Sequence, residues 1–262
     1  MTKLPAAPLT MEGSWILHQM IRLRWNSADL ESKLVSLISK LESQGSAAFA
    51  MPGHKGDLLL VHFRATPDAL NQADVLVAKA LDGIADIVNS YVSVIELGLY
   101  ESSVKLYDSL VQKGVVPHSP EWNQAIEETL GRQRTAMASR LFPAIPDDKY
   151  VCFYPMNKRR GEIKNWYGLP IQDRQRQMAE HGEVGRRYAG AVRQIISGSI
   201  GYEAWEWGVD LFSNNPLVFK HLVYEMRFDE ASYDYGEFGE FFFGVRLKPE
   251  GASAYLKGEA IA

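Results

Sequence analysis

Two short stretches in the second half of the chain contain residue types that could do chemistry. The first, Tyr154-Pro155-Met156-Asn157-Lys158, ends on an ammonium group four residues after an oxidisable phenol. The second, Met178-Ala-Glu-His181-Gly-Glu-Val-Gly-Arg186, contains an imidazole, which can bind a metal ion through a neutral ring nitrogen. A neutral amide at Gln194 and a run from Tyr224 to Ser232 follow within fifty residues.

Several other chemistries lack their motifs. The sequence has no G-x-x-x-x-G-K-[ST] phosphate loop and no H-E-x-x-H zinc pair, and Cys152, the one cysteine, excludes thiolate metal clusters. The run from Ser197 to Gly201 resembles a nucleophile elbow, but its first required glycine is a serine, so we expect a turn. Because Pro155 favours an extended Tyr154, the Tyr–Lys pair of a short-chain dehydrogenase helix is also disfavoured.

Composition sets limits on the class of protein. The chain has 262 residues, 46% hydrophobic and 23% charged, with 28 Lys and Arg against 32 Asp and Glu, which predicts a folded globular protein. A net charge of −4 offers no basic excess for a nucleic-acid backbone. The apolar runs are too short to cross a bilayer, the first residues lack the apolar core of a signal peptide, and one cysteine suits a reducing compartment. We therefore expect a cytoplasmic protein with no nucleic-acid or membrane partner.

Hydrophobic periodicity predicts alternating strands and helices, in an order that occurs twice. The first half reads as a strand, a helix, a Gly/Pro-containing loop, a strand, a helix and a strand, at residues 14–25, 30–41, 46–56, 57–64, 67–87 and 91–100. A connector and a helix over 122–141 follow. The second half reads as a strand, helical segments, a strand, a helix beginning at Pro216 and a last strand, at residues 150–154, 171–197, 201–213, 216 onward and 240–248. Two α+β units of similar order suggest an internal duplication.

The combination of Y-P-M-x-K with M-x-x-H-G-x-x-G-R resembles the chlorite dismutase-like haem proteins, and most closely the coproheme decarboxylases. The resemblance covers nearly the whole chain in element order and reaches motif level from Tyr150 to Ser232. It implies an α+β fold in which two ferredoxin-like halves form a dimeric α+β barrel within one chain. Residues 1–118 would then be mainly scaffold, and residues 119–262 would bind haem and catalyse the reaction.

The same resemblance implies a reaction and roles for particular residues. In that family, hydrogen peroxide oxidises the iron of coproporphyrin III, a tyrosyl radical removes a hydrogen from a propionate, and loss of carbon dioxide leaves a vinyl group. Two such steps convert coproheme into haem b. His181 matches the iron ligand, Tyr154 the radical site and Lys158 a propionate partner. The other positions expected at the substrate are Arg140, Pro155, Met156, Asn157, Gln194, Arg227 and Ser232.

Gln194 distinguishes the activities within the family. Chlorite dismutases have a cationic arginine at this position, whereas a neutral amide matches the decarboxylases of Gram-positive type. The neighbouring Arg193 is expected to point elsewhere, because one helical step rotates a side chain by about 100°. Chlorite dismutation, a non-enzymatic haem-binding role and a haem-free structural role remain alternatives. The resemblance also implies a homopentamer, which composition does not test.

Overall fold

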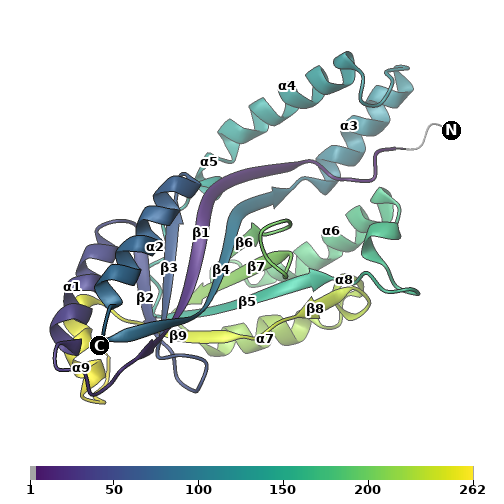
Figure 1. The fold of residues 1–262 in the computed structure, drawn as a ribbon. Helices are drawn as coiled ribbons and strands as arrows, with labels where there is room; N and C mark the ends of the chain where they lie inside the picture. Colours follow the sequence, from purple (N-terminus) through teal and green to yellow (C-terminus); the bar gives the residue numbers. More distant parts are fainter. Residues whose placement is uncertain (1–3, 262) are drawn as a thin grey trace.

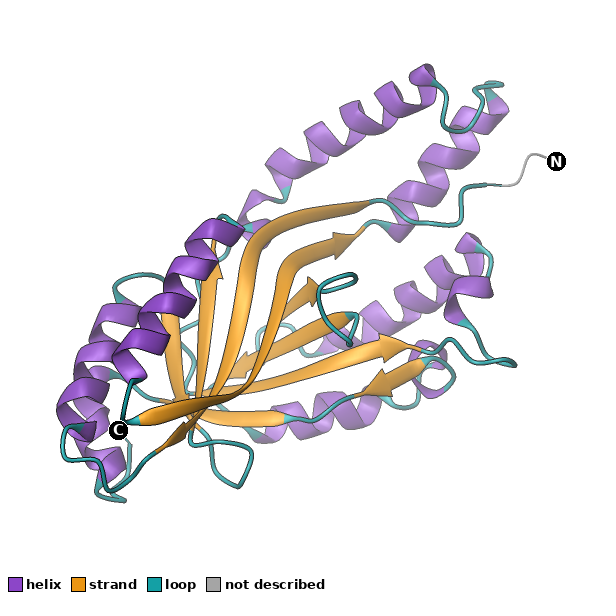
Figure 2. Cartoon of the chain, viewed as in Figure 1, coloured by secondary structure: helices purple, strands orange, loops and turns teal. Residues whose placement is uncertain are grey.

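Nine strands of the computed structural model, which describes residues 4–261, form one antiparallel sheet (Figures 1 and 2). Their bounds are β1 Thr10–Leu23, β2 Ser46–Ala50, β3 Leu58–Arg64, β4 Ala85–Gly98, β5 Tyr150–Lys158, β6 Arg193–Gly198, β7 Trp207–Ser213, β8 Gly236–Phe238 and β9 Phe242–Arg246. The strand order is β7-β6-β4-β1-β3-β2-β9-β5-β8, and β7 also pairs with β5. This extra pairing closes the sheet on itself.

The helices lie outside the sheet or beside it (Figure 2). Their bounds are α1 Leu30–Glu42, α2 Pro67–Leu81, α3 Tyr100–Gln112, α4 Pro120–Ala136, α5 Ala138–Leu141, α6 Ile171–Arg187, α7 Leu217–Met226, α8 Glu230–Tyr233 and α9 Ala252–Leu256. Within residues 4–261, none of them combines the length and the apolar character that a membrane-spanning helix needs. The expected α+β class is confirmed.

The order of elements repeats along the chain. The first part runs β1-α1-β2-β3-α2-β4, and its strands are arranged β4-β1-β3-β2. The second runs β5-α6-β6-β7-α7, then β8 and β9, and its four long strands are arranged β9-β5-β7-β6. Helices α3, α4 and α5 connect the two parts and extend away from the sheet in Figure 1.

Side chains alternate between the two faces of the closed sheet, as strand geometry requires. One cluster of buried strand residues, including Ile16, Phe49 and Phe153, fills the inside. Outside the first part, α1 and α2 cover a second apolar cluster that includes Leu34. Outside the second part, α7 covers a third cluster, which includes Tyr154. The first and third clusters therefore lie on opposite faces of β5.

The structure corrects several expected element boundaries. Residues 46–50 form strand β2 rather than a loop, because β2 is buried between β3 and β9 and shows no alternating pattern. Helix α2 ends at Leu81, since Gly83 has a φ of +76° and β4 begins two residues later. Residues 201–206 form a turn, and only residues 207–213 pair as a strand. Helix α3 was not expected.

Another correction concerns the residues around Gln194. Helix α6 ends at Arg187, Gly190 turns the chain with a φ of +89°, and residues 193–198 form strand β6, which pairs with β7. The expected helical step between Arg193 and Gln194 is therefore wrong. Neighbouring strand residues point to opposite faces, so the two side chains still diverge. Arg193 indeed reaches Asp148, with 2.8 Å between Nη2 and Oδ2.

Strand β5 continues through Pro155 to Lys158, four residues beyond its expected end. Pro155 has no N–H to donate, and the strand accommodates it at a gap between two partners. On that side of β5, pairing with β9 ends at Phe153 and pairing with β8 begins at Met156. The Pro155 carbonyl there accepts a hydrogen bond from the Gly239 N–H at 2.8 Å. In an antiparallel strand the N and O of one residue point to the same side, so no sheet hydrogen bond is lost.

Candidate functional site

Strand β5 sorts the residues of the Tyr154–Lys158 run onto two faces. Tyr154 and Met156 belong to the cluster under α7, together with Cys152 two residues before Tyr154. Lys158 continues this alternation and is 7% exposed. Pro155 and Asn157 fall on the other face. The structure thus places the phenol and the ammonium group on the same face of one rigid strand.

Aromatic rings and a guanidinium group surround Tyr154. The Tyr154 ring stacks on Phe241 with 4.5 Å between centroids, and its centroid lies 5.9 Å from that of Phe238. The guanidinium group of Arg227 lies 5.0 Å from the centre of the Phe238 ring. Burial raises the pKa of Tyr154, and the positive charge of Arg227 only partly opposes this shift. The phenol is therefore neutral at physiological pH, and one-electron oxidation has to remove its proton as well.

The ammonium group of Lys158 is held from two sides. Its Nζ donates a hydrogen bond to the Ala231 carbonyl at 2.8 Å and lies 4.5 Å from the centre of the Trp166 ring. Burial lowers the pKa of Lys158 to about 8, and the carboxylate of Asp229 opposes this shift. Lys158 is thus mostly protonated near neutral pH, but it gives up its proton far more readily than an exposed lysine.

His181 lies on α6 and is oriented by a carboxylate. Its Nδ1 is 2.9 Å from Asp229 Oδ2, and its side chain is 27% exposed. Burial tends to raise the pKa of Asp229, but the hydrogen bonds from His181 and Ser232 and the charge of His181 outweigh burial and leave it lowered. With Nδ1 occupied in this way, Nε2 is the nitrogen left for a metal, an arrangement that iron- and zinc-ligating histidines commonly use.

The segment from Arg227 to Ser232 brings the expected site residues together. Arg227 approaches the aromatic rings around Tyr154, the Asp229 carboxylate binds His181, and the Ala231 carbonyl binds Lys158. Ser232 donates through its N–H at 3.0 Å and its Oγ at 3.1 Å to the Asp229 carboxylate. Asp229 is the N-cap of α8, which explains its fixed position. Residues more than seventy positions apart therefore meet around one short turn.

Gln194 lies next to the helix that contains His181. A Cβ on Gly185 would lie 3.6 Å from Gln194 Nε2 and 3.5 Å from Met226 Cε. Gly185 is four residues after His181, so both residues lie on one face of α6. The neutral amide of Gln194 and the imidazole are thus neighbours along the same helix face.

Other expected substrate residues have different surroundings. Asn157 Oδ1 accepts a hydrogen bond from the Glu206 N–H at 2.7 Å, on the face of β5 away from Tyr154. Arg140 is exposed on α5, a helix that packs against β1 and β4, and its Nη1 lies 3.8 Å from the sulfur of Met137. Neither contact joins the group around the Arg227–Ser232 segment, so substrate roles for Asn157 and Arg140 stay predictions.

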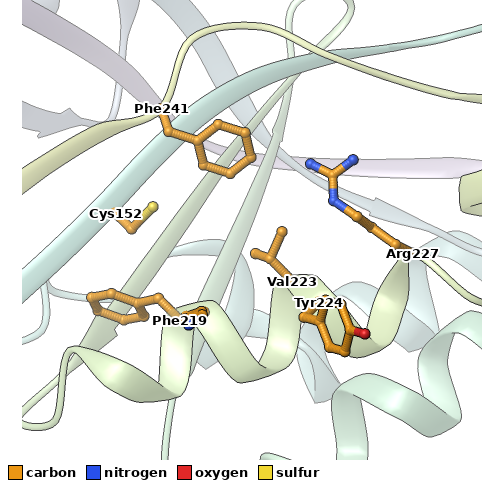
Figure 3. Close-up of a pocket in the computed structure, with 7 residues that line it drawn as sticks. Cys152, Phe219, Val223, Tyr224, Arg227 and Phe241 are labelled. Carbon is orange, nitrogen blue, oxygen red and sulfur yellow. The ribbon is translucent and has the colours of Figure 1, made fainter.

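A pocket of about 290 Å³ lies between Phe241 and α7 (Figure 3). Phe241, which stacks on Tyr154, forms one wall, and α7 forms the opposite wall with Phe219, Val223 and Tyr224. Arg227 and Lys220 add positive charge to this otherwise apolar lining.

The donor set fits an iron porphyrin better than a metal held by protein ligands alone. Among residues 4–261, no group of three or more His, Cys, Asp or Glu side chains is placed to hold a metal ion. An iron porphyrin already provides four nitrogen ligands and needs one axial donor from the protein, which the His181 imidazole offers. Lys158, Arg227 and Lys220 would supply positive charge for its carboxylates.

Comparison with known proteins agrees with this geometry. The sequence model of the family described as chlorite dismutase matches residues 27–247. The chain belongs to the chlorite dismutase family. A solved haem-binding protein from Thermus thermophilus has a similar fold, with a TM-score of 0.80 and 38% identity over 97% of this chain and 99% of that one. The mixed α+β fold is therefore that of the family.

Two curated relatives differ in how much of their length this family member covers. A coproheme decarboxylase from Thermus thermophilus is 40% identical over 96% of this chain and 97% of its own length. A putative haem-binding protein from Haloquadratum walsbyi is 38% identical over 97% of this chain. The chain spans only 48% of that second relative.

Sequence reasoning missed the residues that support the expected site. Asp229 lies within the matching motif but received no role, although an Asp preceding a four-residue helix is a typical N-cap. Trp166, to which the sequence motifs assign no role, is buried against Lys158. Phe241 gave only an alternating-strand signal, and its stacking on Tyr154 depends on the tertiary fold. Of the three, only Asp229 could have been found from the sequence.

Proposed function

We propose that this chain is a peroxide-dependent coproheme decarboxylase, which converts two propionates of iron–coproporphyrin III into vinyl groups and gives haem b. The observation that carries the proposal is the meeting of His181, Lys158 and the surroundings of Tyr154 around the Arg227–Ser232 segment. Family membership and the Thermus relative named coproheme decarboxylase support it. Coproheme is both the substrate and the redox centre.

The overall reaction balances for each propionate. The side chain loses carbon dioxide and two hydrogen atoms, and one hydrogen peroxide is reduced to two water molecules. Iron and peroxide together supply the two oxidising equivalents. The protein has to bind a porphyrin with four carboxylates, orient one reacting propionate and provide a group that removes a hydrogen atom.

Each site residue has a defined task in this proposal. The Nε2 of His181 binds the iron, and Asp229 fixes the imidazole ring and increases its basicity. The Lys158 ammonium pairs with a propionate, and Arg227 and Ser232 add further polar contacts. The Tyr154 phenol, neutral because it is buried, loses an electron and a proton and then takes a hydrogen atom from the β-carbon of the propionate. Met156 packs beside Tyr154 on the same face of β5.

Gln194 favours decarboxylation over chlorite dismutation. Its side chain is a neutral amide, which can donate and accept hydrogen bonds but cannot retain an anionic oxychlorine intermediate by charge. Arg193, the adjacent cation, pairs with Asp148. Sustained oxygen release from chlorite would contradict this assignment.

We further propose that residues 1–118 and 119–262 are two ferredoxin-like halves that form a dimeric α+β barrel, the first mainly scaffold and the second catalytic. The repeated element order and the matching strand orders β4-β1-β3-β2 and β9-β5-β7-β6 support this division. A homopentamer, inferred from the family resemblance, and a cytoplasmic location, consistent with the single buried Cys152, are part of the same proposal. Analytical ultracentrifugation tests the oligomer.

Mass spectrometry of the porphyrin tests the function. The native protein, loaded with coproheme and given peroxide, should yield products that have lost one and then two units of carbon dioxide plus two hydrogens. Tyr154→Phe should bind coproheme but form vinyl groups at least ~100-fold more slowly, a cost typical of losing a reacting group. Tyr150→Phe, on the same strand and stacked on Phe243, is the matched control and should react normally. Equal product from the native protein and Tyr154→Phe would remove the radical role.

A further inference from the structure

We infer that Glu206 is a positioning residue for Lys158, and this inference rests on the proposed function. Glu206 lies in the turn before β7 and is 7% exposed. The sequence pattern places it beside Trp207, but neither the motif nor the proposed reaction gives it a task. Its carboxylate is nevertheless the meeting point of the end of β5 and the loop that follows.

Three contacts converge on the Glu206 carboxylate. Oε2 accepts hydrogen bonds from the Lys158 backbone N–H at 3.2 Å and from the Tyr167 phenol at 2.8 Å. Oε1 lies 3.5 Å from Arg160 Nη1. These donors belong to the last residue of β5, the loop after it and the 3₁₀ turn Trp166–Gly168. The buried Glu206 side chain thus contacts three successive segments: the end of β5, the loop after it and the 3₁₀ turn.

The Glu206 backbone is also held by hydrogen bonds, through both its N–H and its carbonyl. Its N–H donates to Asn157 Oδ1 at 2.7 Å, and its carbonyl accepts from the Ser199 N–H at 2.7 Å. The position of the carboxylate is therefore set by β5 itself and by the start of its own turn. This explains the side-chain contact of Asn157, which faces away from Tyr154.

The loop that Glu206 contacts provides Trp166, which packs against one side of the Lys158 side chain. Residues 159–166 form a hairpin in which the Trp166 N–H donates to the Arg159 carbonyl at 2.9 Å and Arg160 bridges to Asn165. Trp166, 1% exposed, lies next to Tyr167 and directly under the Lys158 ammonium. Trp166 also packs against Tyr100 and Tyr235. We therefore expect loss of the Glu206 contacts to loosen the end of β5 and the hairpin, so that the Trp166 ring confines the Lys158 side chain less tightly.

The consequence for the substrate is specific. Lys158 is the proposed partner of a reacting propionate, so freeing its side chain should weaken coproheme binding by the loss of pre-organisation. Haem b lacks both reacting propionates, and its binding should be insensitive to Glu206. A general loosening of the fold would weaken both porphyrins alike.

The first test measures Lys158 in the unliganded protein. Native protein and variants are exposed briefly to an amine-acylating reagent, and modification of Lys158 relative to the exposed Lys105 is followed by mass spectrometry. In Glu206→Ala, Lys158 should react about 10-fold faster, the effect of losing hydrogen bonds to a charged acceptor. Glu206→Gln should stay close to native, since an amide oxygen can still accept from Lys158 and Tyr167. The matched control is Glu203→Ala in the same turn, whose carboxylate accepts from the Val92 N–H at 2.9 Å. This control should leave Lys158 protected.

The second test compares porphyrins. Absorbance titration should show coproheme binding weakened about 10-fold in Glu206→Ala and haem b binding unchanged. Should Glu206→Ala not fold, Tyr167→Phe removes one hydrogen bond and should raise Lys158 labelling about 5-fold. Native labelling of Lys158 in both Glu206→Ala and Tyr167→Phe, or equal weakening for both porphyrins, would overturn the inference. A native protein that forms no vinyl groups would instead contradict the proposed function, and the labelling result would still decide the role of Glu206.

Discussion

Helices α1 and α6 follow the first strand of each repeated part of the chain, but they bury different kinds of side chain. Helix α1 buries five aliphatic residues, Leu30, Leu34, Leu37, Ile38 and Leu41. Helix α6 instead buries Arg174 and Gln177 and leaves His181 partly exposed, and it packs mainly against α3, α7 and α8 rather than against the sheet. Gln177 is held through Glu230, with 3.0 Å between Nε2 and Oε1. Helix α1 thus packs through an apolar core, whereas α6 keeps polar side chains around the histidine that we propose as the iron ligand.

The largest expected effect comes from replacing His181 on α6, with a replacement of His62 on β3 as the control. His181→Ala should abolish the axial coordination of coproheme iron, seen as loss of the native Soret band position, and should stop vinyl formation. His62→Gln, under the helices of the first part, should leave the spectrum and the reaction unchanged. His62 is fully buried, and its ring contacts Ser46 and Gln19. A native Soret spectrum in His181→Ala would contradict the assignment of His181 as the iron ligand.

A smaller effect is expected one contact away from the iron. Asp229→Asn should weaken iron-porphyrin binding about 10- to 100-fold, because the carboxylate that orients the His181 ring is lost. Asp234→Asn is the matched control at the other end of α8, where the carboxylate pairs with Lys164 at 2.6 Å. Absorbance titration of both variants checks this prediction. Equal affinities in the two variants would show that Asp229 does not support the ligand.

The smallest expected effect is on the pH dependence of the unfolding free energy, and it arises from His62 in the first part of the sheet. Burial, with the charges of Arg64 and His18, lowers the pKa of His62 to about 3, well below its ordinary value of 6.5. As pH falls below 6.5 the unfolded chain binds a proton at this residue and the folded chain does not. His62 therefore costs up to about 1.4 kcal/mol of unfolding free energy per pH unit between pH 6.5 and about 3. Urea denaturation at several pH values should show a shallower loss in His62→Gln than in the native protein.

The fold could be predicted from the sequence where periodicity is strong. Amphipathic patterns located β1, α1, β3 and α7 to within a few residues. They failed for β2, which is buried on both faces, and for residues 193–198, where a short strand follows a helix. Tertiary pairing with β7, rather than local preference, makes that segment extended. Pattern and structure therefore differ most where long-range contacts decide the conformation.

The site could be predicted only as a set of residues. The motifs named His181, Tyr154 and Lys158, because their residue types and spacing match a known family. The contacts of Asp229 and Glu206 could not be read from spacing, since each lies 48 positions from its partner, His181 or Lys158. Nor could the sequence show that Asn157 faces away from Tyr154, which required the register of β5. Supporting residues are the part of a site that only the structure provides.

A crystal structure of the protein with ferric coproheme tests the central claim most directly. We expect the iron on Nε2 of His181, the macrocycle outside the second part of the sheet, and a propionate between the Tyr154 phenol and the Lys158 ammonium. Iron bound by any other side chain, or a macrocycle whose propionates all point away from Tyr154, would contradict the account.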